Sequence, residues 1–250
     1  MPETPTPWTE LRRFTAARVA LGRAGNGLPT AAHLDFQEAH ARARDAVHSA
    51  LDADALEAAL APLGLPALRV ASQAEDRRSY LLRPDLGRRL REGDRARLAA
   101  AAAPGAFLFV VADGLCGRGV LAQAPAVLQR AVPLLRRAGL AIAPLVIASQ
   151  ARVALGDEIG EAMGAGMVAV LIGERPGLTA TDSLGIYLTF APRRGRTDAE
   201  RNCISNIREG GMDAQAAAEK LLWLAGAALR LGATGVMLKD EQPAIPLIAP

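Results

Sequence analysis

The sequence contains few of the residues from which disulfide frameworks and zinc sites are built. It has two cysteines, Cys116 and Cys203, and three histidines. The two cysteines are far apart in the chain, so no Cys-x-x-Cys pair is present. We therefore expect neither a disulfide framework nor a structural zinc ion. Such cysteine usage is typical of a protein that stays inside the cell.

Lysine is also scarce, because the chain has only Lys220 and Lys239 and relies on arginine for positive charge. A phosphate-binding P-loop needs a lysine after Gly-x-x-x-x-Gly, and neither lysine stands in that context, which excludes Walker-type NTP hydrolysis. The glycine-rich stretches Gly22–Gly27 and Gly114–Gly119 have the order Gly-x-x-Gly-x-Gly. This order is not the dinucleotide fingerprint, so we expect these glycines to form turns.

Long hydrophobic runs are missing as well. No apolar run reaches the roughly 18 to 20 residues of a membrane helix, and the first residues lack the pattern of a signal peptide. The net charge of +3 comes from 29 basic and 26 acidic residues spread along the chain. This balance does not favour a nucleic-acid surface. We expect a cytoplasmic protein without nucleic-acid or membrane partners.

The pattern of apolar residues divides the chain into two regions. Residues 1–103 are predicted to form a helical N-terminal region, with breaks at glycine and proline clusters. Residues 104–250 show short apolar runs that alternate with helical stretches, which predicts an α/β domain. The predicted strands are Phe107–Gly114, Leu140–Ser149, Met167–Gly173 and Leu184–Ala191, and the predicted helices are Ala124–Ala138, Gly156–Gly164 and Ala214–Leu231. Crossovers of this length predict a doubly wound, mostly parallel, Rossmann-like sheet.

Polar residues follow the predicted strands directly. They are Asp113, the segment Gln150–Val153, Glu174 and Arg175. Ligands of open parallel sheets bind at the carboxyl ends of the strands, so these residues form a candidate binding site. Helix capping and loop solvation are the alternative roles for each of them.

The histidines have a simpler interpretation than metal binding. All three lie in one predicted helix, Thr30–Leu51, for which Thr30 is the expected N-cap. Seven helical residues separate His33 from His40, which places them roughly 10 Å apart and too far to bind one metal ion. We expect partner contact or partial burial for these side chains.

Four stretches together resemble the small subunit of ethanolamine ammonia-lyase, between about Leu11 and Leu238. They are ARVALGRAG followed by LDFQEAHARARDAV, then YLLRPDLGRRL, then LIGERPGL, and finally ERNCISNIREGG. The family converts ethanolamine to acetaldehyde and ammonia with adenosylcobalamin. The resemblance implies a large-subunit partner, a TIM barrel that carries the substrate site, in an assembly of six small and six large subunits. It also implies that this chain has no catalytic residue and no metal ligand of its own.

The resemblance places the cofactor-binding positions at Val153, Glu174 and Cys203. Glu174 would accept hydrogen bonds from amide or ribose groups, and its alternative role is an ion pair with Arg175 or Arg152. Val153 and Cys203 would contribute backbone groups and packing, and Cys203 is not expected to be a reactive thiolate. No histidine stands in Asp-x-His-x-x-Gly, which favours base-on binding of the cobalamin.

Two other functions compete with this one. The first is a stand-alone enzyme that binds a nucleotide or S-adenosylmethionine through Asp113 or Glu174, against which the missing glycine fingerprint counts. The second is a non-catalytic assembly subunit that does not touch the cofactor. Mutation of Glu174 separates the assembly subunit from the cobalamin-lyase subunit, because only in the latter should Glu174→Ala weaken cobalamin affinity in the assembled complex.

The remaining expectations concern the surface and the ends. Residues Gly87–Arg91 and Leu34–Val47 mix charges and apolar positions on a helical pattern, so they are expected to contact the large subunit or to be solvated. Some family members carry a longer N-terminal extension linked to bacterial microcompartments. Only ten residues precede Leu11 here, so encapsulation is doubtful but stays open. The tail from Asp240 is expected to pack on the surface.

Overall fold

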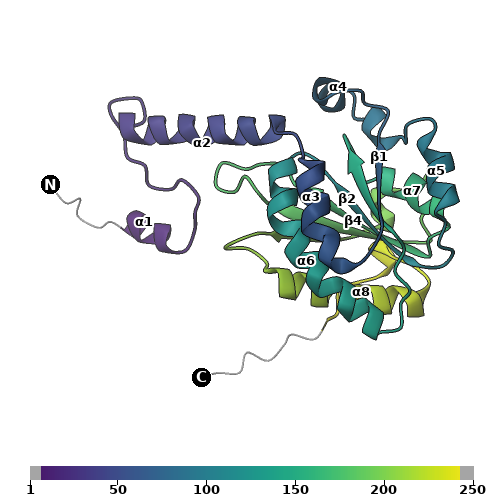
Figure 1. Cartoon of the computed structure of the whole chain (residues 1–250). Helices are drawn as coiled ribbons and strands as arrows, with labels where there is room; N and C mark the ends of the chain where they lie inside the picture. Colours follow the sequence, from purple (N-terminus) through teal and green to yellow (C-terminus); the bar gives the residue numbers. More distant parts are fainter. Residues whose placement is uncertain (1–6, 243–250) are drawn as a thin grey trace.

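A six-stranded sheet forms the centre of the molecule, in a computed structural model that describes residues 7–242. The strand order is β1-β3-β2-β4-β5-β6 (Figure 1). The strands are β1 (Ala67–Ala71), β2 (Phe107–Ala112), β3 (Leu145–Ser149), β4 (Met167–Gly173), β5 (Leu184–Phe190) and β6 (Asn202–Ile207). The first four strands in this order are parallel, and β5 and β6 are antiparallel to their neighbours.

Helices cover both faces of the sheet, which confirms the doubly wound α/β class. One face carries α3 (Ala53–Leu60), α6 (Gly117–Arg137) and α8 (Ala214–Leu231), and the other carries α5 (Asp94–Ala100) and α7 (Leu155–Met163). Two further helices, α1 (Pro7–Glu10) and α2 (Thr30–His48), precede them, and α4 (Arg77–Leu82) follows β1. Short 3-10 turns are found at Leu11–Arg13, Ala61–Leu63, Leu86–Arg88, Asp198–Glu200 and Gly235–Met237.

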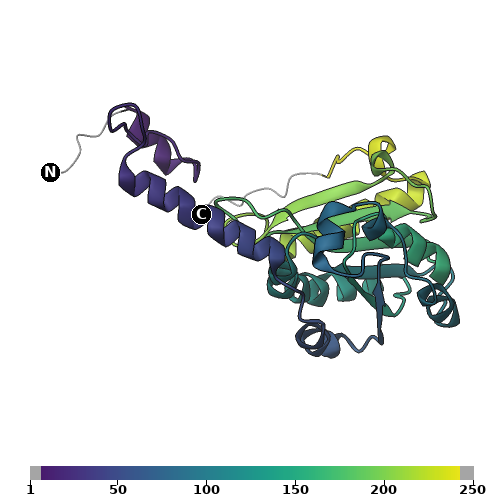
Figure 2. The same cartoon turned by 90° about the horizontal axis from the view of Figure 1, so that it is seen from above.

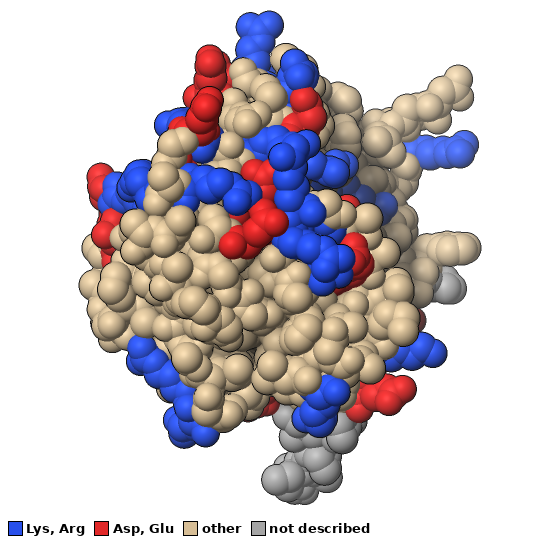
Figure 3. Space-filling model, turned by 90° about the vertical axis from the view of Figure 1, so that its right-hand side faces the viewer, with Lys and Arg blue, Asp and Glu red and all other residues tan. Residues whose placement is uncertain are grey.

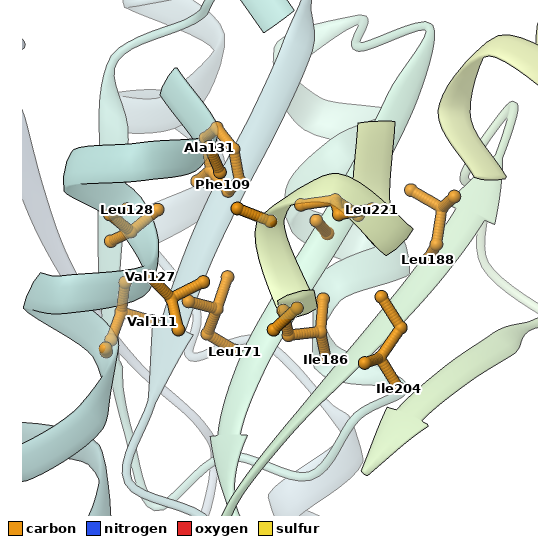
Figure 4. Close-up of a cluster of buried hydrophobic side chains, with 14 of the residues drawn as sticks. Phe109, Val111, Val127, Leu128, Ala131, Leu171, Ile186, Leu188, Ile204 and Leu221 are labelled. Atoms are coloured by element: carbon orange, nitrogen blue, oxygen red, sulfur yellow. The ribbon is translucent and has the colours of Figure 1, made fainter. Parts of the chain in front are cut away.

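Successive side chains of β2 point to opposite faces of the sheet, so the hydrophobic core has two layers. Phe107, Phe109 and Val111 pack toward α6 and α8, whereas Leu108 and Val110 pack toward α7. Figure 4 shows the first layer, in which side chains of the sheet meet those of α6 and α8. Every residue of β2 and β4 is buried. Each large apolar side chain removed from water here contributes about 1.5–3 kcal/mol, so these two strands anchor the fold.

The structure corrects three strand predictions. Residues 67–71 form β1, an edge strand beside β3, although they fall in the region predicted to be helical. The sequence Ala-Leu-Arg-Val-Ala contains good helix formers, and only pairing with β3 makes it a strand. The second predicted strand is shorter, because it begins at Leu145. The polar strand β6 was not predicted, since its half-exposed residues carry no apolar run.

The direction of β5 also differs from a fully parallel sheet. The segment from Glu174 to Ser183 contains no helix that could carry the chain back to the other end of the sheet. A parallel connection needs such a crossover, so β5 pairs antiparallel with β4. The division of the chain at residue 103 stays a prediction, although β1 makes part of the first region a component of the sheet.

Helix ends show two further differences. Thr30 is the first helical residue of α2 and not its cap, because Pro29 holds the N-cap position and no side chain caps the helix. The helix α6 begins at Gly117 and not near Ala124. Its cap is Cys116, whose Sγ accepts a hydrogen bond from the backbone N–H of Gly119 at 3.3 Å. A helix that begins inside a glycine-rich stretch is poorly visible from sequence.

The N-terminal arm, residues 7–48, extends away from the body of the molecule (Figures 1 and 2). Most side chains of α2 are exposed, and only Ala39 and Ala46 are buried. Trp8 and Phe14 are also exposed, at 69% and 86%. All three histidines of α2 are exposed, so partial burial is wrong for them, whereas partner contact stays a prediction. Among residues 7–242, no helix is both long and apolar enough to cross a membrane.

Candidate functional site

A cleft of about 500 Å³ opens at the edge of the sheet where β2, β3 and β4 end. We call it the strand-end cleft. Its lining comes from the three loops that follow these strands, together with side chains of α4 and β5. The lining residues are Tyr80, Gly114, Leu115, Arg152, Val153, Ile172, Gly173, Glu174, Arg175 and Tyr187. A cleft is therefore present at the strand ends where a binding site was expected, and Val153, Glu174 and Arg175 all line it.

Asp113 lies beneath this cleft and not in it. Its carboxylate accepts hydrogen bonds from the backbone N–H groups of Gln150 at 2.8 Å and Ala151 at 2.9 Å. Asp113 is only 4% exposed, and burial raises its pKa, while the two N–H groups and Arg77 oppose the rise. Both carboxylate oxygens thus hold the loop after β3 against the end of β2. The alternative role in loop support is the one that the structure shows for Asp113.

Two glycines allow the loops after β2 and β4 to pack closely at the strand-end cleft. Gly114 has φ +55°, and a Cβ there would lie 2.4 Å from the carbonyl oxygen of Gly173. A Cβ on Gly173 would lie 2.2 Å from the carbonyl oxygen of Cys116. The loops after β2 and β4 therefore pack backbone against backbone, which only glycine permits. The predicted turn is confirmed for Gly114, whereas Gly117 and Gly119 serve close packing in the first turn of α6.

Tyr80 supports the side of the cleft formed by α4. Its ring is fully buried, and its hydroxyl donates a hydrogen bond to the carbonyl of Ala151 at 3.2 Å. The guanidinium groups of Arg77 and Arg152 lie 4.7 and 4.2 Å from the ring centroid. Burial raises the pKa of Tyr80 to about 12, so the hydroxyl stays protonated and fixes the loop that carries Val153.

Glu174 follows β4 and is held by two groups of neighbouring segments. Its carboxylate accepts hydrogen bonds from the hydroxyl of Ser183 and from the backbone N–H of Asn206 at 3.2 Å. Within residues 7–242, no ion pair involves Glu174, so the alternative pairing with Arg175 or Arg152 is wrong. The carboxylate is thus oriented by two neutral donors, one from the segment before β5 and one from β6.

Cys203 lies one strand away from the cleft lining. It is the cross-strand partner of Tyr187, and Tyr187 itself lines the cleft. Burial and the neighbouring Cys203 raise the pKa of Tyr187. Loss of hydration around the sulfur likewise raises the pKa of Cys203, although the residue as a whole is exposed. The raised pKa of Cys203 agrees with the expectation of an unreactive thiol. Its exposure, however, excludes the role of a buried apolar side chain.

A second cavity, of about 540 Å³, lies beside the first and between α2 and the loop after β4. We call it the α2 cavity. It is lined mainly by apolar atoms, with His40, Arg44 and His48 contributed by α2. Leu115, Arg152 and Arg175 line both cavities, so these three residues lie where the two cavities adjoin. No signal in the sequence predicts this cavity, because α2 and the loop are more than a hundred residues apart.

The arginine-rich segment Gly87–Arg91 is not helical throughout, contrary to the prediction. A 3-10 turn ends at Arg88, and Leu90 is buried under the sheet face covered by α7. Basic and acidic side chains intermingle on this side of the molecule (Figure 3). Here Arg89 and Arg194 pair with Glu158 at 3.2 and 3.6 Å. The segment therefore combines packing with an ion-pair network, and its contact with a partner stays a prediction.

The donor set of the strand-end cleft fits a large organic ligand better than a metal ion. Within residues 7–242, no group of three histidine, cysteine or acidic side chains could hold a metal. The cleft offers backbone groups at Gly114 and Gly173, one carboxylate, guanidinium groups and the apolar face of Val153. Tyr80, Tyr187, Gly114 and Gly173 line the cleft but were not predicted as site residues. Tyr80 and Gly173 stand in the family-like stretches YLLRPDLGRRL and LIGERPGL, and Gly114 opens a glycine-rich stretch, so only Tyr187 lies outside every motif.

The fold and the cleft together define a doubly wound α/β protein with a cleft at the carboxyl ends of its parallel strands. Comparison with known proteins identifies the family within this class. The family model "Ethanolamine ammonia-lyase light chain" matches residues 5–239. The chain belongs to this family, which confirms the resemblance noted from its motifs.

Individual relatives agree with the family match. The chain is 54% identical to the ethanolamine ammonia-lyase small subunit of Rhodopseudomonas palustris, over 93% of this chain and 89% of the relative. It is also 54% identical to the small subunit from Bradyrhizobium diazoefficiens, over 94% and 91%. The small subunit of Azotobacter vinelandii is 52% identical over 96% and 90%. Each comparison extends over almost the full length of both chains.

Proposed function

We propose that this chain is the small subunit of an adenosylcobalamin-dependent ethanolamine ammonia-lyase and that it completes the cofactor site of a large subunit. The observation that carries the proposal is the convergence of Val153 and Glu174. These two family-implied positions come from different loops and line one cleft, with Cys203 paired to Tyr187 at its border. The assembly expected from the resemblance contains six small and six large subunits.

Bound adenosylcobalamin would supply the radical that converts ethanolamine to acetaldehyde and ammonia. The residues of this chain would bind and orient the cofactor without taking part in that chemistry. Glu174, held by Ser183 and Asn206, would accept hydrogen bonds from amide or ribose groups of the cofactor. Val153 would present its backbone and a small apolar surface on a loop that Asp113 fixes. The cleft would exclude water from this side of the cofactor.

Base-on binding forms part of the proposal. In this state the intact nucleotide tail of the cofactor would lie against this chain. The strand-end cleft offers polar backbone, one carboxylate and aromatic and apolar side chains to such a tail. No histidine lines this cleft, and the nearest histidines border the α2 cavity instead.

The first test is ammonia release from ethanolamine with adenosylcobalamin and the large subunit, with and without this chain. We expect activity only when both chains are present. Activity of the large subunit alone, unchanged by addition of this chain, would refute the proposed role. Inactivity of a verified, cofactor-loaded complex would refute the assignment of ethanolamine as substrate.

A second test separates a cofactor-binding subunit from a scaffold. In the assembled complex, Glu174→Ala should raise the Kd of adenosylcobalamin roughly ten- to hundredfold, because a charge-assisted hydrogen bond contributes about 1.5–3 kcal/mol. The rate at saturating cofactor should be largely preserved. Glu174→Gln retains the shape and the contact with Ser183, so it controls for misfolding. Glu219→Gln, on α8 and away from the cleft, is the matched control. An unchanged Kd for Glu174→Ala would instead indicate a scaffold.

A further inference from the structure

Leu115, Arg152 and Arg175 line both the strand-end cleft and the α2 cavity, and we call the place where these three residues lie the neck. Two guanidinium groups therefore stand between the cavities. Arg152 comes from the loop after β3, and Arg175 comes from the loop after β4. Arg44, on α2, lines the outer cavity. Three separate segments thus contribute arginines to the lining of two adjoining cavities.

These arginines lack acidic partners within residues 7–242. Arg152 donates one hydrogen bond, from Nη2 to the carbonyl of Tyr80 at 3.1 Å, and forms no ion pair. Arg175 and Arg44 are exposed and have neither a side-chain hydrogen bond nor an ion pair in this range. On the α5–α7 face, by contrast, Arg89 and Arg194 share the carboxylate of Glu158. The positive charge at the neck is therefore not neutralised by the chain itself.

The carboxylate of Glu174 does not offset this charge. It is the single acidic side chain that lines either cavity in the described part of the chain, and Ser183 and Asn206 hold it. Three guanidinium groups against one carboxylate leave a net positive lining. Attraction between charges is stronger in a partly enclosed space than in open solvent. The neck thus favours an anionic group.

The shape of the space adds a second constraint. Around the cations, the α2 cavity is mainly apolar, with Val47, Leu81 and Leu178 among its lining residues. A ligand that fits must therefore carry a compact anion between less polar parts. Arginine presents planar pairs of N–H donors, a geometry that matches the oxygens of a phosphate group.

We propose that the neck is a phosphate subsite in which Arg152 and Arg175 bind the phosphate of an organic phosphate ester, with Arg44 adding long-range attraction. The inference rests on the proposed function for its natural ligand, which would be the phosphodiester in the nucleotide tail of the cobalamin. It extends the site beyond Val153, Glu174 and Cys203 to residues in the neck. The α2 cavity then receives the part of the ligand beyond the phosphate.

The test uses the complete enzyme with two cofactor forms. Adenosylcobalamin carries the phosphodiester, and adenosylcobinamide lacks both the phosphate and the base. Arg175→Gln should raise the Kd of adenosylcobalamin about tenfold or more and leave the Kd of adenosylcobinamide unchanged. Arg175→Lys should restore part of the affinity. Arg137→Gln, at the opposite end of α6, removes one exposed charge and is the matched control.

Inorganic phosphate provides an independent probe with the full chain alone. Saturable shifts of the Arg152 and Arg175 Nε–H signals in NMR spectra would support the subsite, and loss of the shifts in Arg175→Gln would place it at the neck. Phosphate-dependent shifts at the neck, together with an unchanged Kd of both cofactors in Arg175→Gln, would retain the subsite but refute the cobalamin tail as its ligand. Absence of both the shifts and the cofactor discrimination, or equal weakening of both cofactors by Arg175→Gln, would overturn the subsite even if the chain still restores ammonia release.

Discussion

Arg201 and Asp157 form a bidentate ion pair that joins the loop before β6 to the first turn of α7. Their atoms meet at 2.6 Å (Nη1 to Oδ1) and 2.8 Å (Nη2 to Oδ2), and the two side chains are 2% and 3% exposed. Arg201 also donates to the hydroxyl of Thr189 and to the carbonyl of Arg196. The pair fixes the antiparallel end of the sheet to the helix that starts beside the cleft.

Removing one partner of this pair should be strongly destabilising. Asp157→Asn would leave the buried Arg201 without a full counter-charge, so the free energy of unfolding should fall by about 3–5 kcal/mol. Urea unfolding followed by circular dichroism measures the loss. Asp85→Asn is the control, because the Arg83–Asp85 pair is about 60% exposed and should contribute less than about 1 kcal/mol. Equal effects of the two substitutions would contradict the role assigned to burial.

Stability in acid should depend on Glu200. Its carboxylate accepts a hydrogen bond from the backbone N–H of Thr197 and pairs with Arg196, which lowers the pKa of Glu200 from 4.5 to about 2. A lowered pKa in the folded state means that the ionised form is stabilised. This contribution is present above about pH 5 and is lost as pH falls toward the folded pKa.

The measurement is the melting temperature between pH 6 and about pH 2. The parent chain should lose more thermal stability over this interval than Glu200→Gln, whose side chain does not titrate. At pH 6 the variant should be the less stable protein. Parallel acid profiles of the two proteins would show that Glu200 does not carry this dependence.

Substitution of glycine by alanine should lower stability more where the glycine is in close contact with another loop than where it only forms a turn. Gly139 has φ +85° and no atom near its missing side chain, so Gly139→Ala should cost about 1–2 kcal/mol from backbone strain alone. Gly114→Ala adds a clash at 2.4 Å and should cost roughly 1–3 kcal/mol more. Chemical unfolding of both variants compares the two losses. A milder effect at Gly114 would mean that the loops after β2 and β4 separate easily.

The two cysteines should differ in their chemical reactivity. The raised pKa of the Cys203 thiol lies above its ordinary value of 9.0, so the reactive thiolate is rare at neutral pH. Cys116 is buried and donates to the carbonyl of Thr181 at 2.9 Å. Iodoacetamide should therefore label Cys203 slowly at pH 7.5, faster as pH rises, and Cys116 only after unfolding.

Mass spectrometry of the labelled peptides gives the rate for each cysteine, and Cys203→Ser should abolish labelling of the folded chain. In the assembled complex, adenosylcobalamin should protect Cys203 if the residue borders the cofactor as proposed. Rapid labelling of Cys203 at neutral pH would show a depressed pKa and contradict the environment described here.

The buried centre of the sheet and most of the long helices can be predicted from the amino-acid sequence. The runs at Phe107 and Met167 are short and apolar, which is typical of strands covered on both faces. The predicted final helix, Ala214–Leu231, has the bounds that the structure shows. The strand ends also indicated the edge of the sheet at which the cleft lies, because parallel strands place their carboxyl ends together. The motifs determined the family.

Tertiary structure decided what each polar residue at that edge does. Asp113 and Glu174 both follow buried strands. Both carboxylate oxygens of Asp113 accept hydrogen bonds from backbone N–H groups beneath the cleft, whereas Glu174 lines the cleft. That difference depends on which loops lie nearby and cannot be inferred from either neighbourhood in the chain. Three other features could not be predicted from sequence neighbours either. They are the strand β1, the pairing of Tyr187 with Cys203 and the neck between the cavities. Each requires contacts between distant segments, which exist only after the hydrophobic core has brought those segments together.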